Sequence, residues 1–129
     1  MKITIGKVKQ LFQSDKIKKL ANANVTPIKE KWKLSKNLTL LAELNGRVEK
    51  EYNELIIKYG KEEGEGFTIN PKLENGEDNP NFLEFAEKAN ELLAIEEEID
   101  IKTISIDAFP LDADLDLADL IQLDFMIEG

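Results

Sequence analysis

One regular apolar spacing in the middle of the chain constrains the fold more than any other feature. The positions that share it are separated by alternating steps of four and three residues: Leu34, Leu38, Leu41, Asn45, Val48, Tyr52, Leu55 and Tyr59. A seven-residue repeat of this kind predicts a helix whose seam packs against a partner helix. Ile28 and Trp32 extend the apolar face toward the N-terminus, which favours burial of Trp32 in the core. We therefore predict one helix from Pro27 to Tyr59, about 50 Å long.

Residue types also mark the ends and the middle of this helix. Thr26 before Pro27 is typical of a helix start, because threonine caps free amides and proline tolerates the first helical position. Gly60 is a plausible C-terminal stop. Asn45 is polar on the seam and Gly46 follows it, so this pair either sets the register or divides the helix in two.

A second helix is expected after an irregular connection. Asp78, Asn79 and Pro80 are typical of a helix start, and the apolar stripe that follows reaches about Glu98. We expect this helix to be the antiparallel partner of the first. Residues 60–79 between them are rich in glycine and polar residues and read as an irregular insertion with one short strand at GFTI.

Three short stretches have the composition of strands. The N-terminal MKITI is one and GFTI is another, and the best alternation lies in residues 99–106. This alternation slips between Lys102 and Thr103, which indicates a bulge or a bend. We expect the three strands to form one small antiparallel sheet. A helical spacing also occurs in residues 7–20, within the basic segment 1–25.

The stretch DADLDLAD, residues 112–119, has the alternating aspartates of a calcium loop. The sixth loop position should be glycine and is Leu117, and the twelfth should be glutamate and is Leu123, so the calcium interpretation fails. Aspartates also suit the first turn of a helix, where they cap amides and favour the positive end of the dipole. We therefore predict a terminal helix over 112–127, apolar enough to need burial on the sheet or on another molecule.

These elements predict a single α+β domain over residues 1–129. A long antiparallel helical hairpin, residues 26–98, lies beside a small antiparallel sheet and a C-terminal apolar helix. The chain contains no cysteine and no histidine, which excludes thiolate nucleophiles and serine–histidine pairs. We expect no enzyme activity, no catalytic residue, no cofactor and no metal site. There is no apolar run for a membrane span and no signal-peptide pattern, so the expected location is intracellular.

Charge is distributed unevenly along the chain. Residues 1–59 carry 13 basic and 6 acidic residues, a net charge of +7, and residues 60–129 carry 4 and 20, a net charge of −16. In the simpler interpretation the two halves fold against each other and partly neutralise. In the other, one half binds a charged partner.

The order of these segments resembles a known group of proteins. VTPIKEKWKLSKNLTLLAELNGRVEKEYNELIIKYG, a polar insertion, FLEFAEKANELLAIEEEIDIKTISI and a terminal LDFMIEG resemble small uncharacterised proteins of phages and prophages of low-GC Gram-positive bacteria and their relatives. The match covers roughly residues 26–127, and the stretch before Thr26 is longer here. The resemblance implies a phage origin, in the host cytoplasm or the virion, and supplies no activity and no catalytic residues.

Three functions follow as hypotheses. The leading one is a non-enzymatic, protein-binding accessory factor for virion or tail assembly, with self-association plausible. The second is an inhibitor of a host defence system, whose carboxylates occupy a basic nucleic-acid groove. Its candidate residues are Glu96, Glu97, Glu98, Asp100, Asp107, Asp112, Asp114, Asp116 and Asp119. The third, which we regard as less favoured, is nucleic-acid binding through lysines. Its candidate residues are Lys16, Lys18, Lys19, Lys29, Lys33 and Lys36.

Overall fold

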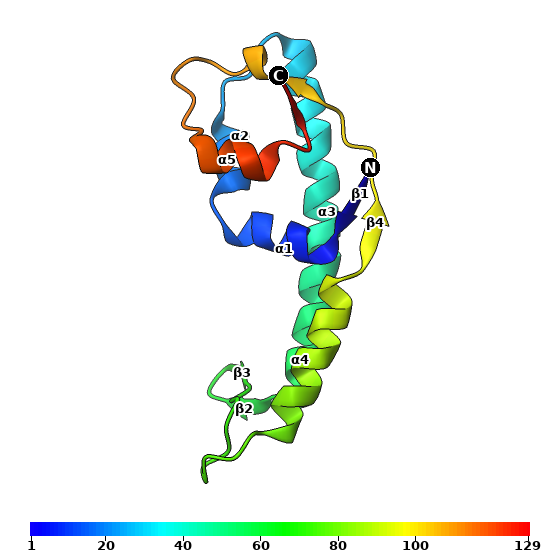
Figure 1. The fold of residues 1–129 in the computed structure, drawn as a ribbon, viewed down its shortest axis with the longest axis vertical. Coiled ribbons are helices and arrows are strands. Elements are labelled where there is room, and N and C mark those ends of the chain that lie inside the picture. Colours follow the sequence, from blue (N-terminus) through cyan, green and yellow to red (C-terminus); the bar gives the residue numbers. More distant parts are fainter.

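The computed structural model describes residues 1–129 as an elongated molecule built along one helix (Figure 1). This helix, α3 (Ile28–Tyr59), runs along most of the length of the molecule, and α4 (Pro80–Leu93) lies antiparallel beside its C-terminal half. Three shorter helices gather at its N-terminal half: α1 (Ile5–Gln13), α2 (Lys16–Asn22) and α5 (Leu117–Leu123). We call residues 49–93 the stalk and the remainder the head. The predicted α+β class and the helical hairpin are confirmed.

The long helix is continuous, with no break at Asn45 and Gly46. Along its repeat, Leu34, Leu41 and Val48 are buried, so the seam is the inner face of α3, as predicted. Its partner changes along the length: the head elements pack on the first part and α4 on the second. The predicted threonine cap is wrong. Pro27 is the residue before the first turn and no side chain caps it, while the Thr26 N–H donates to the carbonyl of Ala108 at 3.0 Å.

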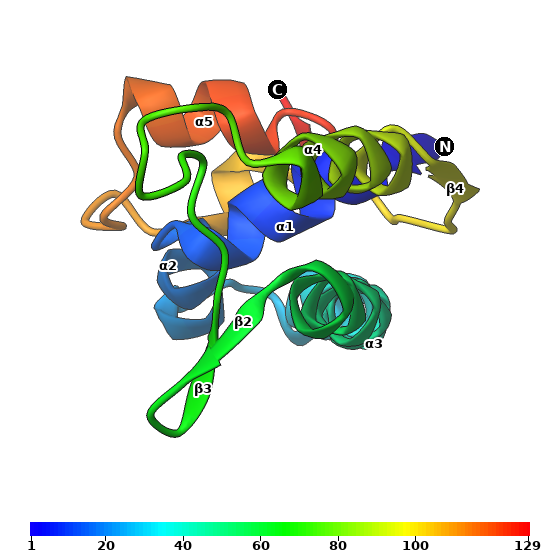
Figure 2. The ribbon, with the colours of Figure 1, turned by 90° about the horizontal axis from the view of Figure 1, so that it is seen from below.

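The second stalk helix begins where its residue types predict, but it ends at Leu93 rather than at about Glu98, because residues 96–98 form a strand. Asn79 caps α4, because its Oδ1 accepts the N–H of Asn81 at 3.1 Å, and Pro80 is the first helical residue. Aromatic packing joins the two stalk helices: the Tyr52 and Phe85 rings meet edge to face, 5.7 Å apart between centroids. The insertion contains a hairpin of β2 (Lys61–Glu63) and β3 (Gly66–Thr68), which projects away from the helices (Figure 2).

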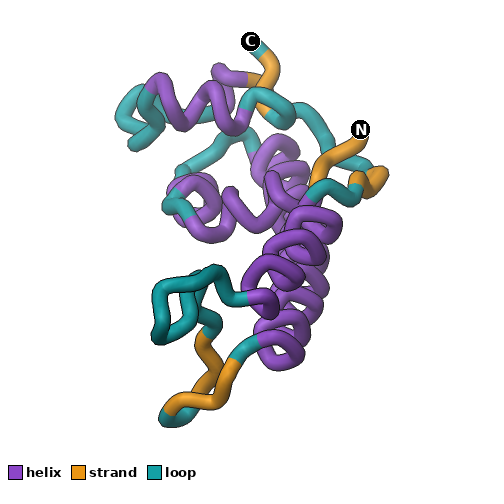
Figure 3. The backbone as a smooth tube through the Cα atoms, turned by 60° about the horizontal axis from the view of Figure 1, so that its bottom comes forward, coloured by secondary structure: helices purple, strands orange, loops and turns teal.

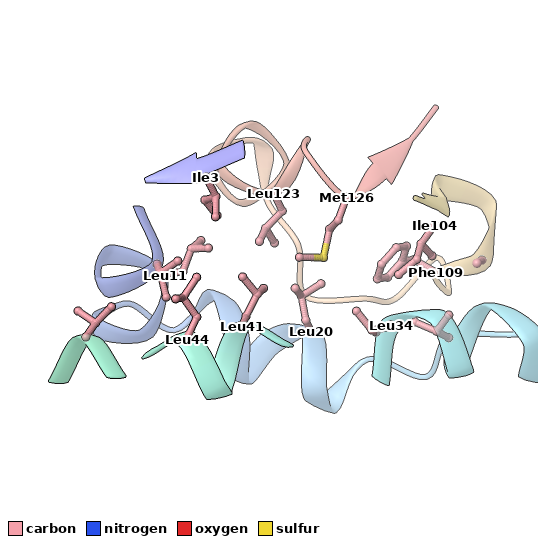
Figure 4. Close-up of a cluster of buried hydrophobic side chains, with 14 of the residues drawn as sticks. Ile3, Leu11, Leu20, Leu34, Leu41, Leu44, Ile104, Phe109, Leu123 and Met126 are labelled. Carbon is pink, nitrogen blue, oxygen red and sulfur yellow. The ribbon is translucent and has the colours of Figure 1, made fainter. Parts of the chain in front are cut away.

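The main core lies in the head, where both ends of the chain meet α3 (Figure 4). Leu11 and Leu20 come from the N-terminal helices, Leu41 from α3, and Leu123 and Met126 from the C-terminal segment, and all are almost completely buried. Residues far apart in the sequence therefore complete one apolar cluster. None of the helices combines the length and the apolar character needed to cross a membrane.

The prediction of a single sheet is wrong, because the strands form three separate pairs. β1 (Lys2–Thr4) pairs antiparallel with β4 (Glu96–Glu98), and Ile3 lies opposite Glu97. β5 (Ile104–Ser105) pairs parallel with β6 (Ile127–Glu128). The third pair is the stalk hairpin of β2 and β3.

The predicted strand over 99–106 is shortened to β5, Ile104–Ser105, for a reason that lies on α3. Asn37 is fully buried there, and its Nδ2 donates to the carbonyl of Lys102 at 2.7 Å. The Lys102 N–H donates back to Asn37 Oδ1 at 2.9 Å. The Asn37 amide thus satisfies the backbone N–H and carbonyl of Lys102, which a neighbouring strand would otherwise pair. This happens at Lys102, where the apolar–polar alternation of the sequence is interrupted.

Both terminal helical predictions need correction. The expected helix in residues 7–20 is divided into α1 and α2 at Ser14, whose hydroxyl donates to the carbonyl of Leu11 at 3.0 Å. The terminal helix covers only Leu117–Leu123 rather than 112–127, because the capping box of Asp116 and Asp119 starts it late. Figure 3 shows this short helix between a long loop and the terminal strand.

Candidate interaction site

A buried carboxylate joins the second helix to the last one. Asp119 on α5 is fully buried, and its two oxygens lie 2.5 Å from Lys16 Nζ and 2.8 Å from Lys19 Nζ. The hydrogen bonds from Lys16 and Lys19 hold the pKa of Asp119 well below its usual range. The same hydrogen bonds raise the pKa of both lysines. We call these three residues the α2–α5 clamp, and it explains how a charged side chain is accommodated inside the head.

The clamp changes the role of several candidate residues. Placing Asp119 on an exposed acidic surface is wrong, because no part of its side chain reaches solvent. Placing Lys16 and Lys19 at a nucleic-acid surface is wrong as well, since both ammonium groups are held by Asp119 and lie within 4 Å of Asp15. Asp116 caps α5 by accepting the Asp119 N–H at 2.8 Å. These four side chains stabilise the head.

The other candidate carboxylates fall into two separate groups. Glu96, Glu98 and Asp100 are exposed around β4, where Glu98 pairs with the N-terminal amine at 3.0 Å and Glu97 is half-buried. The second group consists of Asp107, exposed in the short 3-10 helix η1 (Ile106–Ala108), and of Asp112 and Asp114, exposed in the loop before α5. β4 and the loop that precedes α5 lie on opposite sides of α3 in Figure 1. The structure therefore does not bring the acidic candidates together, and they form no cluster that could hold a metal ion.

Three of the remaining lysine candidates lie in the first turns of α3, and the fourth lies on α2. Lys29 and Lys36 are exposed on α3, and Lys18 on α2 lines a pocket together with Asp112 and Asp114. Lys33 is half-buried and pairs with Glu30 at 3.0 Å, and this hydrogen bond lowers the pKa of Glu30. Glu30 also accepts the N–H of Ser105 at 3.3 Å, so Lys33 and Glu30 fasten α3 to β5.

The most exposed large side chains of α3 occur at the same end. Trp32 is 65% exposed and Ile28 is 82% exposed. The prediction that Trp32 is in the core is wrong, because it lies on the opposite side of the helix from Leu34 and Leu41. The Lys36 ammonium lies 5.8 Å from the centre of the indole ring. We call Ile28, Lys29, Trp32 and Lys36 the Trp32 face.

Further exposed apolar side chains occur at the far end of the stalk. We call residues 54–87 the stalk tip. Its exposed apolar side chains are Ile57, Phe67, Leu73 and Leu83, with exposed fractions of 54%, 40%, 42% and 55%. The tip carries nine acidic residues and three lysines, a net charge of −6. The sequence contains no signal for this tip, because Phe67 and Leu73 lie in the irregular insertion while Ile57 and Leu83 lie beside the buried positions of two helices.

A groove of about 330 Å³ lies where α1, α3 and α4 meet. Leu44, Val48 and Leu92 are among its apolar lining residues. Two basic side chains, Arg47 and Lys50, and two acidic ones also line it. Because these charges balance, the groove shows no preference for a ligand of either sign.

No family model, no curated protein and no solved structure matches this chain. A proposal for its function therefore has to rest on the chemistry of its surface. Among the surfaces described, only the Trp32 face combines a largely exposed tryptophan with unpaired basic side chains on a rigid helix. It is the strongest candidate for an interaction site.

Proposed function

We propose that this protein is a non-enzymatic accessory factor of a phage or prophage, and that it binds a protein partner through the Trp32 face. The observation that supports this most directly is the exposure of Trp32 on a well-packed helix. Covering about 150 Å² of its surface would contribute about 4 kcal/mol before the costs of association. Tryptophan is among the residues most enriched at the energetic centres of interfaces.

The geometry of the face indicates how a partner would bind. Ile28 and Trp32 are four residues apart, the spacing with which a helix presents two anchors to an apolar groove. Lys29 and Lys36 flank the anchors, so a groove with acidic side chains on its rim would match. Such charges mainly accelerate association and exclude wrong partners. The phage origin, and with it a place in the host cytoplasm or virion, is supported by the resemblance of the sequence pattern.

The exposure of Trp32 also favours nucleic-acid binding, as a second candidate function. An exposed indole beside lysines can stack on an unpaired base while the ammonium groups contact phosphates. Against it, only Lys29 and Lys36 lie on the face itself, and the whole chain has a net charge of −9. The acidic inhibitor hypothesis receives less support, because its carboxylates are divided between two sides of the molecule and Asp119 is buried.

A pull-down from infected host lysate tests the proposal. Tagged wild-type protein, a Trp32→Ala variant and an Ile121→Ala variant are compared, and proteins and nucleic acid are identified in each eluate. Ile121 is 62% exposed on α5 and serves as the matched control. We expect a virion or assembly protein with wild type and the control, and its loss with Trp32→Ala. An identical eluate from all three would contradict the proposal, and nucleic acid lost with Trp32→Ala would support the second candidate instead.

A further inference from the structure

The two ends of the long helix carry opposite charge. Residues 28–36, at the head end, contain four lysines and one glutamate, a net charge of +3. The stalk tip has a net charge of −6. Both ends also expose large apolar side chains, Ile28 and Trp32 at one and Ile57 and Leu83 at the other. Along this rod, the surface of α3 near Trp32 is therefore basic and the stalk tip is acidic, with Asp107 and Glu128 of the neighbouring elements also at the head end.

These charges cannot neutralise each other within one molecule. The 32 residues of α3 separate the two ends by about 48 Å, and the screening length is about 8 Å at physiological salt. The expectation that the two halves partly neutralise holds for local contacts such as the α2–α5 clamp, which joins Lys16 and Lys19 to Asp119. It does not hold for the ends of the rod.

We propose that the partner of the Trp32 face is a second copy of this chain, which presents its stalk tip. This rests on the proposed function and names its partner. The lysines around Trp32 meet the carboxylates of the tip, and Ile28 and Trp32 meet its exposed apolar side chains. The protruding hairpin contributes to this surface: both its strands are exposed and Phe67 is 40% exposed. An isolated two-stranded hairpin is only marginally stable in water, so covering it stabilises it.

The predicted contact uses different surfaces on the two copies. A contact of this kind leaves one free Trp32 face and one free tip after each addition, so it repeats head to tail. Each copy in such a row has the orientation set by the previous one. A linear or ring assembly follows, rather than a symmetric dimer, and this is consistent with an assembly role.

Mass measured against protein concentration and salt is the first test. Light scattering after size exclusion, at physiological salt, is expected to give a mass that rises above the monomer mass of 14.6 kDa with concentration. At about 1 M salt the screening length falls to about 3 Å, and we expect the mass to return toward the monomer. Trp32 is the only tryptophan, so its emission reports directly on this face and should shift to shorter wavelength as the mass rises.

Charge reversal then identifies the two surfaces. The head variant is Lys29→Glu with Lys36→Glu, and the tip variant is Glu62→Lys, Glu63→Lys and Glu65→Lys. All five side chains are exposed, and circular dichroism checks that both variants fold. We expect each variant alone to remain monomeric and an equimolar mixture to associate, because the mixture contains one intact pair of surfaces. Lys50→Glu, exposed on α3 outside both proposed surfaces, is the control and should associate like wild type.

Each remaining outcome separates the two proposals. A wild-type chain that stays monomeric at every concentration overturns self-association, while loss of a different captured protein with Trp32→Ala leaves the proposed function standing. A rising mass with unchanged Trp32 emission, or a mixture that fails to associate, overturns the assignment of the surfaces. If neither self-association nor a Trp32-dependent protein is found, both proposals fail.

Discussion

Asn37→Ala should loosen the head by detaching the segment around Lys102. The change removes hydrogen bonds of 2.7 and 2.9 Å, each contributing about 1 kcal/mol. The void left by the buried amide adds about 1 kcal/mol, and the better helix propensity of alanine returns about 0.5 kcal/mol. Water can reach the Lys102 backbone because this residue is exposed, so we expect a loss of about 2 kcal/mol in unfolding free energy.

Urea denaturation gives this loss directly, and thermal unfolding should show a decrease in Tm of about 6–10 °C for a chain of this length. Hydrogen exchange adds a local readout, since the Lys102 amide should exchange faster in the variant than in wild type. Asn53→Ala is the control, because Asn53 is exposed on the same helix and should change stability by less than about 0.5 kcal/mol. An Asn37→Ala variant with wild-type stability and unchanged exchange at Lys102 would refute this account.

Three further predictions concern the clamp and two glycines. The pKa of Asp119 is lowered from 3.8 and those of its lysine partners are raised from 10.5, so the clamp stabilises fully between these values. As pH falls below about 4 the contribution of Asp119 is lost, and Asp119→Asn should lower Tm at pH 7 and flatten its decline in acid. Gly46→Ala should raise stability by about 0.5–1 kcal/mol in urea, because an added Cβ meets nothing within 4 Å. Gly60→Ala should lower it by about 1–3 kcal/mol, because its Cβ would lie 2.4 Å from the Ile56 carbonyl oxygen. Equal urea midpoints for the two glycine variants would contradict the last two expectations.

Local rules predicted the helix start in the stalk and the inner face of α3. The seven-residue repeat identified the inner face of α3, and Asn79 with Pro80 marked the start of α4 within its own first turn. Both signals depend on neighbours three or four residues away, so they survive in any tertiary context. The sequence around Gly46 allows two interpretations, because glycine disfavours a helix while the apolar repeat on either side favours one. The packed seam outweighs about 1 kcal/mol of propensity, and the helix continues.

The head could not be read in the same way, because its decisive contacts join distant residues. Asn37 has no local signature that distinguishes a buried amide from an exposed one, yet it determines the path of residues 99–103. Asp119 was grouped with its acidic neighbours, although only its position on α5 brings it to Lys16 and Lys19. The prediction for Trp32 is wrong for a different reason. Trp32 lies two positions before Leu34, about 200° around the helix, so the seven-residue repeat already indicates that it faces away from the core.

The joining of the two ends of the chain has a consequence for the order of folding. The clamp links residues about 100 positions apart, and β1 requires β4, whose partner residues are separated by about as many. The buried cluster of the stalk, Tyr59, Phe85 and Ala89, packs against residues within 49–93, so it can form while synthesis is still under way. The head cannot close until Leu123 and Met126, both fully buried, have left the ribosome. Removing the last seven residues would therefore leave the first helices without their apolar cover, although the helical hairpin would remain.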